Sequence, residues 1–513
     1  MTGKTSLNFV ASLISFGFAF LFGIVFTPFL VSHLGVAAYG LIPLCFSLLM
    51  YLGFLSQSFS QAINRELVAA VNEDNKFNRV FSNASFLSVC FGAALLLFAA
   101  TCAWFITSLI QVPAGFEDGA RHIFLALALA SALSIVGIPF EAVAFSANAL
   151  YVLSASQIVQ TSLRIGVVVV LFLCVSPDLI FVAAGIICGG LGGLTTVATC
   201  AFRIRRTLKI SSADADLTVI TGLARIGSVV MLIQVGSALL SNTDVLLMNL
   251  SLGPEASGRY AVAAQWGSVL RSLGLSVASI FTARVMQIYH SGSKAELGEY
   301  IFNSMTLIGA FVALPAGFVS GVAPHLLGIW LGPAFSNEWD VLVALTLPIA
   351  TNLIFTPPMS LLVASNQVFG LGIAMLLAGI FNVVAGILIL NFSAAAGVGL
   401  ALCIAFSLFL KNAFYVIPRV AGLATISVKS LYISMILSTF WTVGAAGISY
   451  IFASNLTPHT FIGLGICGIL TSILYAALLF ATLPEKLKRL LMDEMRRIGT
   501  SFGLRWKPEV KRE

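Results

Sequence analysis

The sequence predicts an all-α membrane protein with about fourteen transmembrane helices. Apolar segments of about twenty residues recur from Asn8 to Leu483, and each can cross a hydrocarbon core of ~30 Å at ~1.5 Å per residue. The composition agrees, because 59% of the residues are hydrophobic and only 9% are charged, whereas about a quarter are charged in soluble domains. The few polar groups inside the apolar segments are therefore the candidates for function.

Breaks at glycine, proline and charged residues define the expected spans. They cover 8–31, 41–63, 84–110, 123–150, 158–175, 179–202, 222–250, 260–288, 301–327, 341–364, 369–390, 398–417, 426–452 and 461–483. The fifth is short and contains Arg164. Pro348, Pro357 and Pro358 fall within the tenth and predict interruptions of its helix.

An internal repeat predicts how these helices are grouped. The segment 34–39 (LGVAAY) resembles 252–260 (LGPEASGRY), and matching leucine, glycine and serine residues follow each tyrosine. The two segments lie six spans apart, and an even number implies two parallel halves, an arrangement used by alternating-access transporters. We therefore expect a six-helix lobe at 1–210, a second at 211–422 in parallel pseudo-twofold repeat, and two additional C-terminal helices at 423–483.

Basic residues predict the orientation. Most of the 27 lysines and arginines fall in one alternating set of connections, including the pair Lys411 and Arg419 and the basic tail at 484–513, whereas Arg121 and Arg259 fall on the opposite side. Positive loops resist translocation, so both termini should be cytoplasmic. The tail mixes basic and apolar residues, which is typical of a helix on an anionic membrane surface and makes membrane lipids an expected partner.

Several classes of protein are disfavoured. The eight cysteines and five histidines lack metal-ligand spacing, and there is no phosphate-binding G-x-x-x-x-G-K-[ST] motif, so we expect neither a metal nor a cofactor. The net charge of +7 lies in connections and the tail, and no nucleic-acid module is present. A membrane glycosyltransferase or polymerase would need a sizeable soluble loop with carboxylates, and no loop exceeds roughly twenty residues.

Four segments resemble a known family, the polysaccharide-transporter branch of the MOP flippases, which includes the Wzx-type flippases of O-antigen and capsule synthesis. They are 28–39 (PFLVSHLGVAAY), 243–260 (TDVLLMNLSLGPEASGRY), 329–335 (IWLGPAF) and 397–401 (GVGLA), and the resemblance covers roughly 8–419. It implies a cell inner-membrane protein of lipopolysaccharide or related polysaccharide synthesis, which moves an undecaprenyl-diphosphate-linked oligosaccharide to the outer leaflet. A polysaccharide polymerase would then be a candidate partner. An ion-coupled multidrug or small-molecule antiporter of the same superfamily is the alternative.

Three arginines are candidate contacts for an anionic substrate, because a diphosphate head needs cationic groups in a wet cavity. Arg271 lies ~17 Å past Tyr260, too deep to snorkel fully. Arg164 belongs to a polar stripe on the fifth span, and Arg225 lies in the first turn of the seventh. For each arginine, a structural ion pair or an interfacial position is the competing interpretation.

Two acids are candidates for binding a coupling proton or sodium ion. Asp244 follows two serines on one face of the seventh span, and Glu141 lies beside Pro139 in the fourth. Moving one charge through the membrane potential yields about 2.3 kcal/mol per 100 mV, so one or two ions can bias a transport cycle. Pairs of Asp244 with Arg271 and of Glu141 with Arg164 are the structural alternatives.

Overall fold

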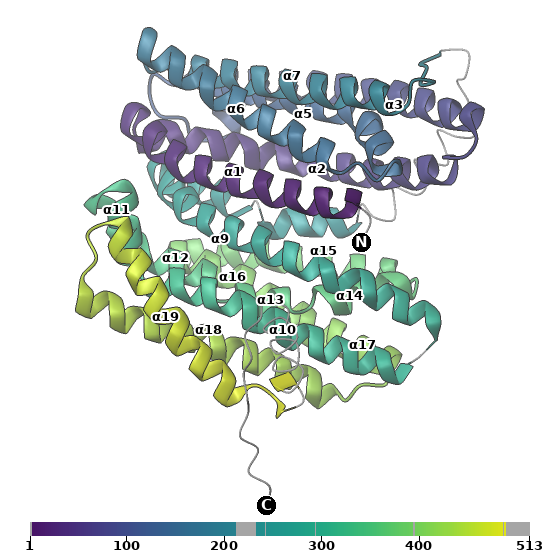
Figure 1. Ribbon diagram of the computed structural model, residues 1–513. Coiled ribbons are helices and arrows are strands. Elements are labelled where there is room, and N and C mark those ends of the chain that lie inside the picture. Colours follow the sequence, from purple (N-terminus) through teal and green to yellow (C-terminus); the bar gives the residue numbers. More distant parts are fainter. Residues whose placement is uncertain are drawn as a thin grey trace, which may run out of the picture. The chain divides into compact units, whose positions relative to one another are not determined.

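The computed structural model describes residues 3–211, 232–241, 243–292, 294–392, 396–485 and 487–488, and every regular element in these ranges is a helix (Figure 1). The chain divides into two compact units. Unit 1 contains 1–269, 330–345 and 365–415, and unit 2 contains 270–329, 346–364 and 416–513. The lobe boundaries expected from the repeat stay a prediction.

The prediction of an all-helical membrane fold is confirmed. Among the described residues, 11 helices are long and apolar enough to cross a membrane, or up to 12 if a bent pair counts as one span. The expected count of fourteen is not confirmed. One reason is that α9, Thr243–Ser291, runs from the end of the seventh expected span through the eighth, with a kink at Gly253.

Unit 1 begins with a bundle of long helices. In chain order they are α1 (Gly3–Leu34), α2 (Val36–Ala69), α3 (Asp74–Trp104), the short α4 (Ile106–Leu109), α5 (Glu117–Ser146), α6 (Tyr151–Cys174) and α7 (Leu179–Ile204). α5 packs against α2, α3 and α7, and α6 packs against α1 and α7. The unit also contains the first part of α9, the 3-10 helix η2 (Pro333–Glu338), most of α12 (Trp339–Thr346), α15 (Val368–Phe392) and α16 (Ala396–Lys411).

Glycines bring α6 and α7 into backbone contact. A Cβ added to Gly185 would lie 2.6 Å from the carbonyl oxygen of Arg164, and one added to Gly189 would lie 2.8 Å from that of Gln160. Lipid is as apolar as the helices, so small residues that permit close van der Waals packing drive helix association in membranes. The contact fixes the rotation of α6 about its axis and thereby the direction of its polar residues.

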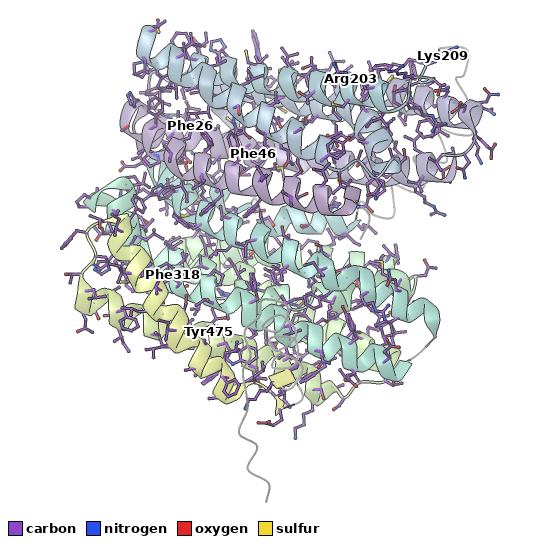
Figure 2. The ribbon with its side chains drawn as sticks, in the orientation of Figure 1. Phe26, Phe46, Arg203, Lys209, Phe318 and Tyr475 are labelled. Carbon is purple, nitrogen blue, oxygen red and sulfur yellow. The ribbon has the colours of Figure 1, made fainter. Side chains whose placement is uncertain are left out.

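Unit 2 is built on α10, Lys294–Gly321, and α18, Val428–Leu456. Their interface also uses small residues, because Cβ atoms added to Gly317 and Gly321 would lie 2.5 and 2.4 Å from carbonyl oxygens of α18. The last helix, α19 (Phe461–Thr482), packs on α18 and more lightly on α10 (Figure 1). Tyr475 and Phe318, labelled in Figure 2, fill the contact between α10 and α19, and the Tyr475 hydroxyl donates to the Ala310 carbonyl at 2.6 Å.

The tenth expected span is interrupted, as its prolines predict. It contains α12, α13 (Ile349–Leu353) and α14 (Thr356–Ala364), and its two parts are bent by 45°. Pro348 precedes α13, and Pro357 and Pro358 lie in the first turn of α14, where a missing N–H costs little. The remaining elements of unit 2 are α11 (Ala323–Leu331) and α17 (Ile417–Ala424).

Candidate functional site

Two glycine junctions organise the candidate site in unit 1. Gly35, between α1 and α2, has φ 81° and ψ 162°, and Gly253, inside α9, has φ 89° and ψ 177°. This backbone region is essentially restricted to glycine. The expected repeat at 34–39 and 252–260 therefore corresponds to the same local geometry in both places.

The helices that follow the two junctions touch at a matched pair of glycines. Gly40 and Gly258 each lie five residues beyond their junction glycine. A Cβ added to Gly40 would be 2.8 Å from the Cα of Gly258, and one added to Gly258 would be 2.6 Å from the carbonyl oxygen of Val36. The junction glycines thus set the register of the repeat.

Asp244 is the most buried acid of the predicted site residues. Its side chain lies in the helix before Gly253 and is only 4% exposed. The Tyr260 hydroxyl, from beyond the junction, donates to Asp244 Oδ2 at 2.7 Å, a distance typical of a hydrogen bond to a carboxylate. An acid inside a membrane span is expensive to keep and therefore points to function by default.

The segments that carry the family resemblance meet around this acid. A Cβ added to Gly397 would lie 3.8 Å from Tyr260 and 3.9 Å from Met248, and it would lie 3.0 Å from Val341 of α12. The motif at 329–335 contacts α9 shortly after its kink, because Arg259 donates to the Ala334 carbonyl at 3.1 Å and its guanidinium lies over the Phe335 ring. The motifs are therefore parts of one structure.

Asn382 is a residue that the sequence reasoning missed. It lies on α15, is 2% exposed, and donates to the Leu239 carbonyl at 3.2 Å, which also accepts from Thr243. Its Oδ1 is buried without a hydrogen-bond partner. The signal was a lone asparagine in the otherwise apolar segment 368–390, but sequence alone could not place it one turn from Asp244.

A second polar region joins α1, α6 and α9. Ser15 donates to Gln157 of α6 at 3.1 Å, and Thr27 donates to Gln265 of α9 at 2.9 Å. Asn8 donates to the backbone of Asn148 at 3.1 Å and accepts from the Tyr151 N–H, which ties α1 to the α5–α6 turn. Side-chain hydrogen bonds therefore tie α1 to α6 near its start and middle and to α9 near its end.

Arg164 lies on α6, two turns beyond Gln157. It is exposed on α6, and in the described part of the chain no hydrogen bond or ion pair joins it to Glu141, which is half-buried on α5. The helix limits explain why. Glu141 lies ~8 Å before the end of α5 at Ser146, whereas Arg164 lies ~20 Å beyond the start of α6 at Tyr151. The pair considered from the sequence is thus wrong, because the two side chains differ in depth by ~12 Å.

The remaining two arginines are less constrained. Arg271 is half-buried and belongs to unit 2, whereas Asp244 belongs to unit 1, so their pairing stays a prediction. Arg225 falls outside the described residues. The roles of Arg164, Arg271, Arg225, Asp244 and Glu141 in transport likewise stay predictions.

Lys411 was expected in a cytoplasmic connection, and this expectation is wrong. It is 6% exposed and lies within the apolar stretch Ala396–Ala424, at the end of α16. The π-helix η3, Asn412–Val416, continues the chain without a break into α17. The mainly apolar residues on both sides of Lys411 were the signal that it is not in a loop.

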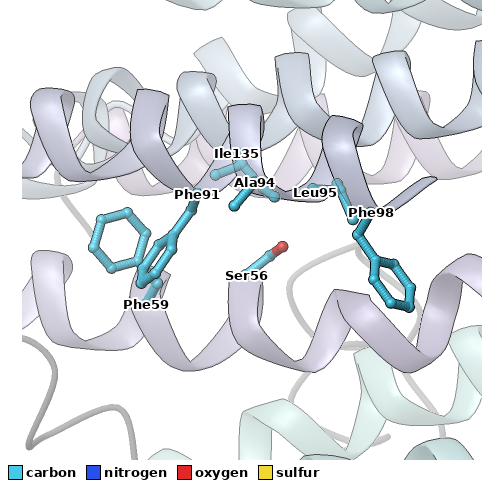
Figure 3. Close-up of a pocket in the computed structure, with 7 residues that line it drawn as sticks. All are labelled: Ser56, Phe59, Phe91, Ala94, Leu95, Phe98 and Ile135. Carbon is cyan, nitrogen blue, oxygen red and sulfur yellow. The ribbon is translucent and has the colours of Figure 1, made fainter. Parts of the chain in front are cut away.

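Unit 1 also has an apolar pocket between α2, α3 and α5. It encloses about 180 Å³ and is lined by Ser56, Phe59, Phe91, Ala94, Leu95, Phe98 and Ile135 (Figure 3). The Phe59 and Phe91 rings pack edge to face with centroids 5.4 Å apart. The pocket has a single hydroxyl and no charged group, so it offers packing rather than chemistry.

No protein-family model matches the chain. Solved structures share its fold. One described as the lipid II flippase MurJ in an inward closed conformation has a TM-score of 0.72 and 13% identity, over 93% of this chain and 99% of its own. An inward-facing multidrug resistance MATE family transporter of the MOP superfamily has a TM-score of 0.65 and 14% identity, over 80% of this chain and 95% of its own.

The chain is therefore a multi-pass membrane protein with the fold of these transporters. A relative narrows the class. The uncharacterized membrane protein EpsK of Bacillus subtilis (strain 168) is 30% identical over 498 residues, which is 95% of this chain and 97% of that protein. The chain belongs to the same family as EpsK.

Proposed function

We propose that this protein is a flippase for a lipid-linked oligosaccharide. It moves an undecaprenyl-diphosphate-linked glycan from the cytoplasmic to the outer leaflet by alternating access, as the resemblance of its motifs to polysaccharide transporters implies. The proposal includes a bacterial cytoplasmic membrane location and cytoplasmic termini. It also includes a polysaccharide polymerase as a candidate partner in the same pathway.

The observation that carries this proposal is the extent of the fold. The lipid II flippase fold spans 93% of this chain, whereas the multidrug transporter folds span 80% to 86%, although each comparison uses nearly all of the other protein. The difference is roughly 35 to 65 residues, about the length of one or two membrane helices. The fold of a lipid-linked substrate carrier therefore accounts for more of this chain than the fold of a drug exporter.

The charged residues support the same substrate class. Arg164 is an exposed cation inside an apolar helix, where a diphosphate would compensate its charge. Arg271 is a second cation inside a span. A guanidinium binds a phosphate through two parallel hydrogen bonds, so two arginines suit a diphosphate.

Asp244 would couple an ion to this movement. Its carboxylate accepts from Tyr260, and Asn382, whose Oδ1 is buried without a hydrogen-bond partner, donates to the Leu239 carbonyl that also accepts from Thr243, the neighbour of Asp244. Oxygen ligands of this kind suit a small hard cation, and the carboxylate alone suits a proton. Transport measured under a proton gradient alone and under a sodium gradient alone distinguishes the two ions.

Reconstitution tests the proposal. Proteoliposomes containing the purified protein and a fluorescent polyprenyl-diphosphate oligosaccharide should show protein-dependent exposure of the glycan to a membrane-impermeant glycosidase. Arg164→Ala and Arg271→Ala should lower the rate at least tenfold, since a hydrogen bond between charged groups contributes about 1.5–3 kcal/mol. Arg271→Lys should retain part of the rate of glycan exposure, because a point charge still attracts phosphate.

Arg121→Ala is the matched control. Arg121 is an arginine of the same bundle, but it forms an i,i+3 surface pair with Asp118 at 2.9 Å, and such pairs contribute little. Its rate should equal that of the unmodified protein. Equal glycan exposure with and without protein, or efflux of a cationic dye in place of glycan movement, would favour the antiporter instead.

The orientation has its own test. A reporter phosphatase that works only outside the cytoplasm should be active when fused after Gly35, Gly253 or Trp330, and inactive after Asn75 or Ser211. Activity at Ser211 would reverse the proposed orientation without affecting the substrate assignment.

A further inference from the structure

Unit 1 contains a larger cavity between α15 and α16, around Lys411. It encloses about 540 Å³, within the range of about 300–1,000 Å³ typical of small-molecule sites. Its walls are almost entirely apolar. They include Ile373, Leu377 and Phe381 from α15 and Leu410 and Phe414 from the opposite segment.

The cavity combines an open apolar mouth with a buried charge. Leu377 and Phe414 are 61% and 75% exposed, whereas Lys411 is 6% exposed and Ser407 is 1% exposed. Ser407 donates to the Cys403 carbonyl at 2.6 Å, which leaves its oxygen lone pairs able to accept a hydrogen bond. A ligand entering from the apolar mouth therefore meets the polar groups at its inner end.

The backbone is irregular at the same place. The π-helix Asn412–Val416 begins directly after Lys411 and carries the cavity residues Phe414 and Tyr415. π-Helical segments are rare and are frequently found at functional sites. The Tyr415 hydroxyl covers Gly370, where an added Cβ would lie only 2.2 Å from it, so a larger residue there would displace the tyrosine side chain.

The chemistry of the ligand follows from this arrangement. A hydrocarbon chain gains little by moving from lipid to an apolar wall, because both surroundings are equally apolar. Preference for one lipid over another must therefore come from the head group. A lysine within a membrane span points to function by default, and its ammonium group carries three N–H donors, which suit the oxygens of a phosphate.

We propose that this cavity is a binding site for an anionic membrane lipid, with a hydrocarbon chain against α15 and α16 and a phosphate-bearing head at Lys411 and Ser407. The proposal does not depend on which cargo the protein moves. Either a phospholipid or a polyprenyl phosphate supplies the required chemistry.

Lipid retention by the full-length protein tests this site. Protein in neutral detergent is equilibrated with phosphatidylglycerol and phosphatidylcholine of identical chains, and the bound lipids are counted by native mass spectrometry. We expect phosphatidylglycerol to be preferred at least about fivefold, which corresponds to one lysine acting on an anionic lipid. Lys411→Gln should bring the ratio close to one, and Lys411→Arg should preserve it.

Two further variants separate the chain from the head group. Leu377→Trp narrows the apolar mouth and should lower retention of both lipids. Lys429→Gln removes an exposed lysine at the start of α18 that does not line the cavity. It should change the retention of neither lipid. An unchanged ratio in Lys411→Gln, an equal loss in Lys429→Gln, or unchanged retention in Leu377→Trp would overturn the proposal.

Competition identifies the source of the phosphate. Displacement of phosphatidylglycerol by undecaprenyl phosphate supports a site that accepts both kinds of chain, and failure of undecaprenyl phosphate to compete supports one limited to phospholipids. Displacement by inorganic diphosphate at the same concentration would show that the hydrocarbon chain contributes nothing, and would overturn the lipid assignment. If Lys411→Gln does not fold, Lys411→Arg and Leu377→Trp still decide the outcome.

Discussion

The two glycine junctions of unit 1 have the same backbone geometry but different side-chain chemistry. Beyond Gly35, Tyr39 is buried and its side chain faces Thr27 of α1. Beyond Gly253, Tyr260 reaches back to the preceding helix and donates to Asp244. A tyrosine thus lies at both junctions, but only the second junction contains a titratable partner, so of the two junctions only the second offers a candidate position for an ion-dependent step.

The largest expected effect comes from changing that partner. Asp244→Asn should leave substrate binding nearly intact but abolish the dependence of transport on the ion gradient, because the amide keeps the shape and the hydrogen bond but cannot ionise. Thr27→Val, the corresponding change at the first junction, should leave gradient dependence unchanged. Transport is measured as accumulation of the substrate in proteoliposomes, with either a proton gradient or a sodium gradient imposed alone.

A double mutant separates coupling from charge neutralisation. If Asp244 only neutralises Arg271, Asp244→Asn should lower the folded yield, and adding Arg271→Gln should restore both yield and gradient-dependent transport. Full recovery of gradient-dependent transport in the double mutant would refute the coupling role.

The second expected effect concerns the place where the junctions meet. Gly40→Val and Gly258→Val should each destabilise the protein by about 3 kcal/mol or more, since each new side chain would meet backbone that cannot move aside. Gly166→Val on α6 is the control, because nothing lies within 4 Å of a Cβ added there. Folded yield and the midpoint of thermal unfolding in detergent provide the measurement. An unchanged folded yield and thermal midpoint in Gly258→Val would contradict the close contact between the two helices that follow the junctions.

Different parts of the molecule could be predicted from sequence to different degrees. Long apolar runs define helices, because a spanning segment must satisfy its own backbone hydrogen bonds. The repeat was also visible, but it was aligned on Tyr39 and Tyr260, whereas the junction glycines and the Gly40–Gly258 contact give a register three residues different. Glycine was the better marker because its conformation is required, while the longer segment between Gly253 and Tyr260 shifts the tyrosine along the helix.

The candidate site was less predictable because it depends on contacts distant in sequence. Asp244 was recognisable as an acid in an apolar segment, but its partner Tyr260 and the nearby Asn382 lie beyond a junction or on another helix. Lys411 was misplaced because positive charge was interpreted as a loop signal, although apolar residues continue on both sides of it. Lysine and arginine residues therefore indicate a connection between helices only where the hydropathy of the surrounding residues also falls.

The smallest expected effect tests whether the junctions are equivalent. Gly35→Ala and Gly253→Ala should each cost about 1–3 kcal/mol, because alanine is strained in this backbone region. Space is not the cause, since nothing lies within 4 Å of a Cβ at Gly35 and only the Gln111 Oε1, at 3.6 Å, lies near one at Gly253. Gly17→Ala, on α1 with open space around it, should be neutral or stabilising by up to about 1 kcal/mol. Similar losses of thermal stability at both junctions would support a common backbone joint to which the second half adds an acid. A loss at Gly253 alone would instead show that the strain serves the Asp244–Tyr260 pair, and the two junctions would then differ in backbone as well as in side chains.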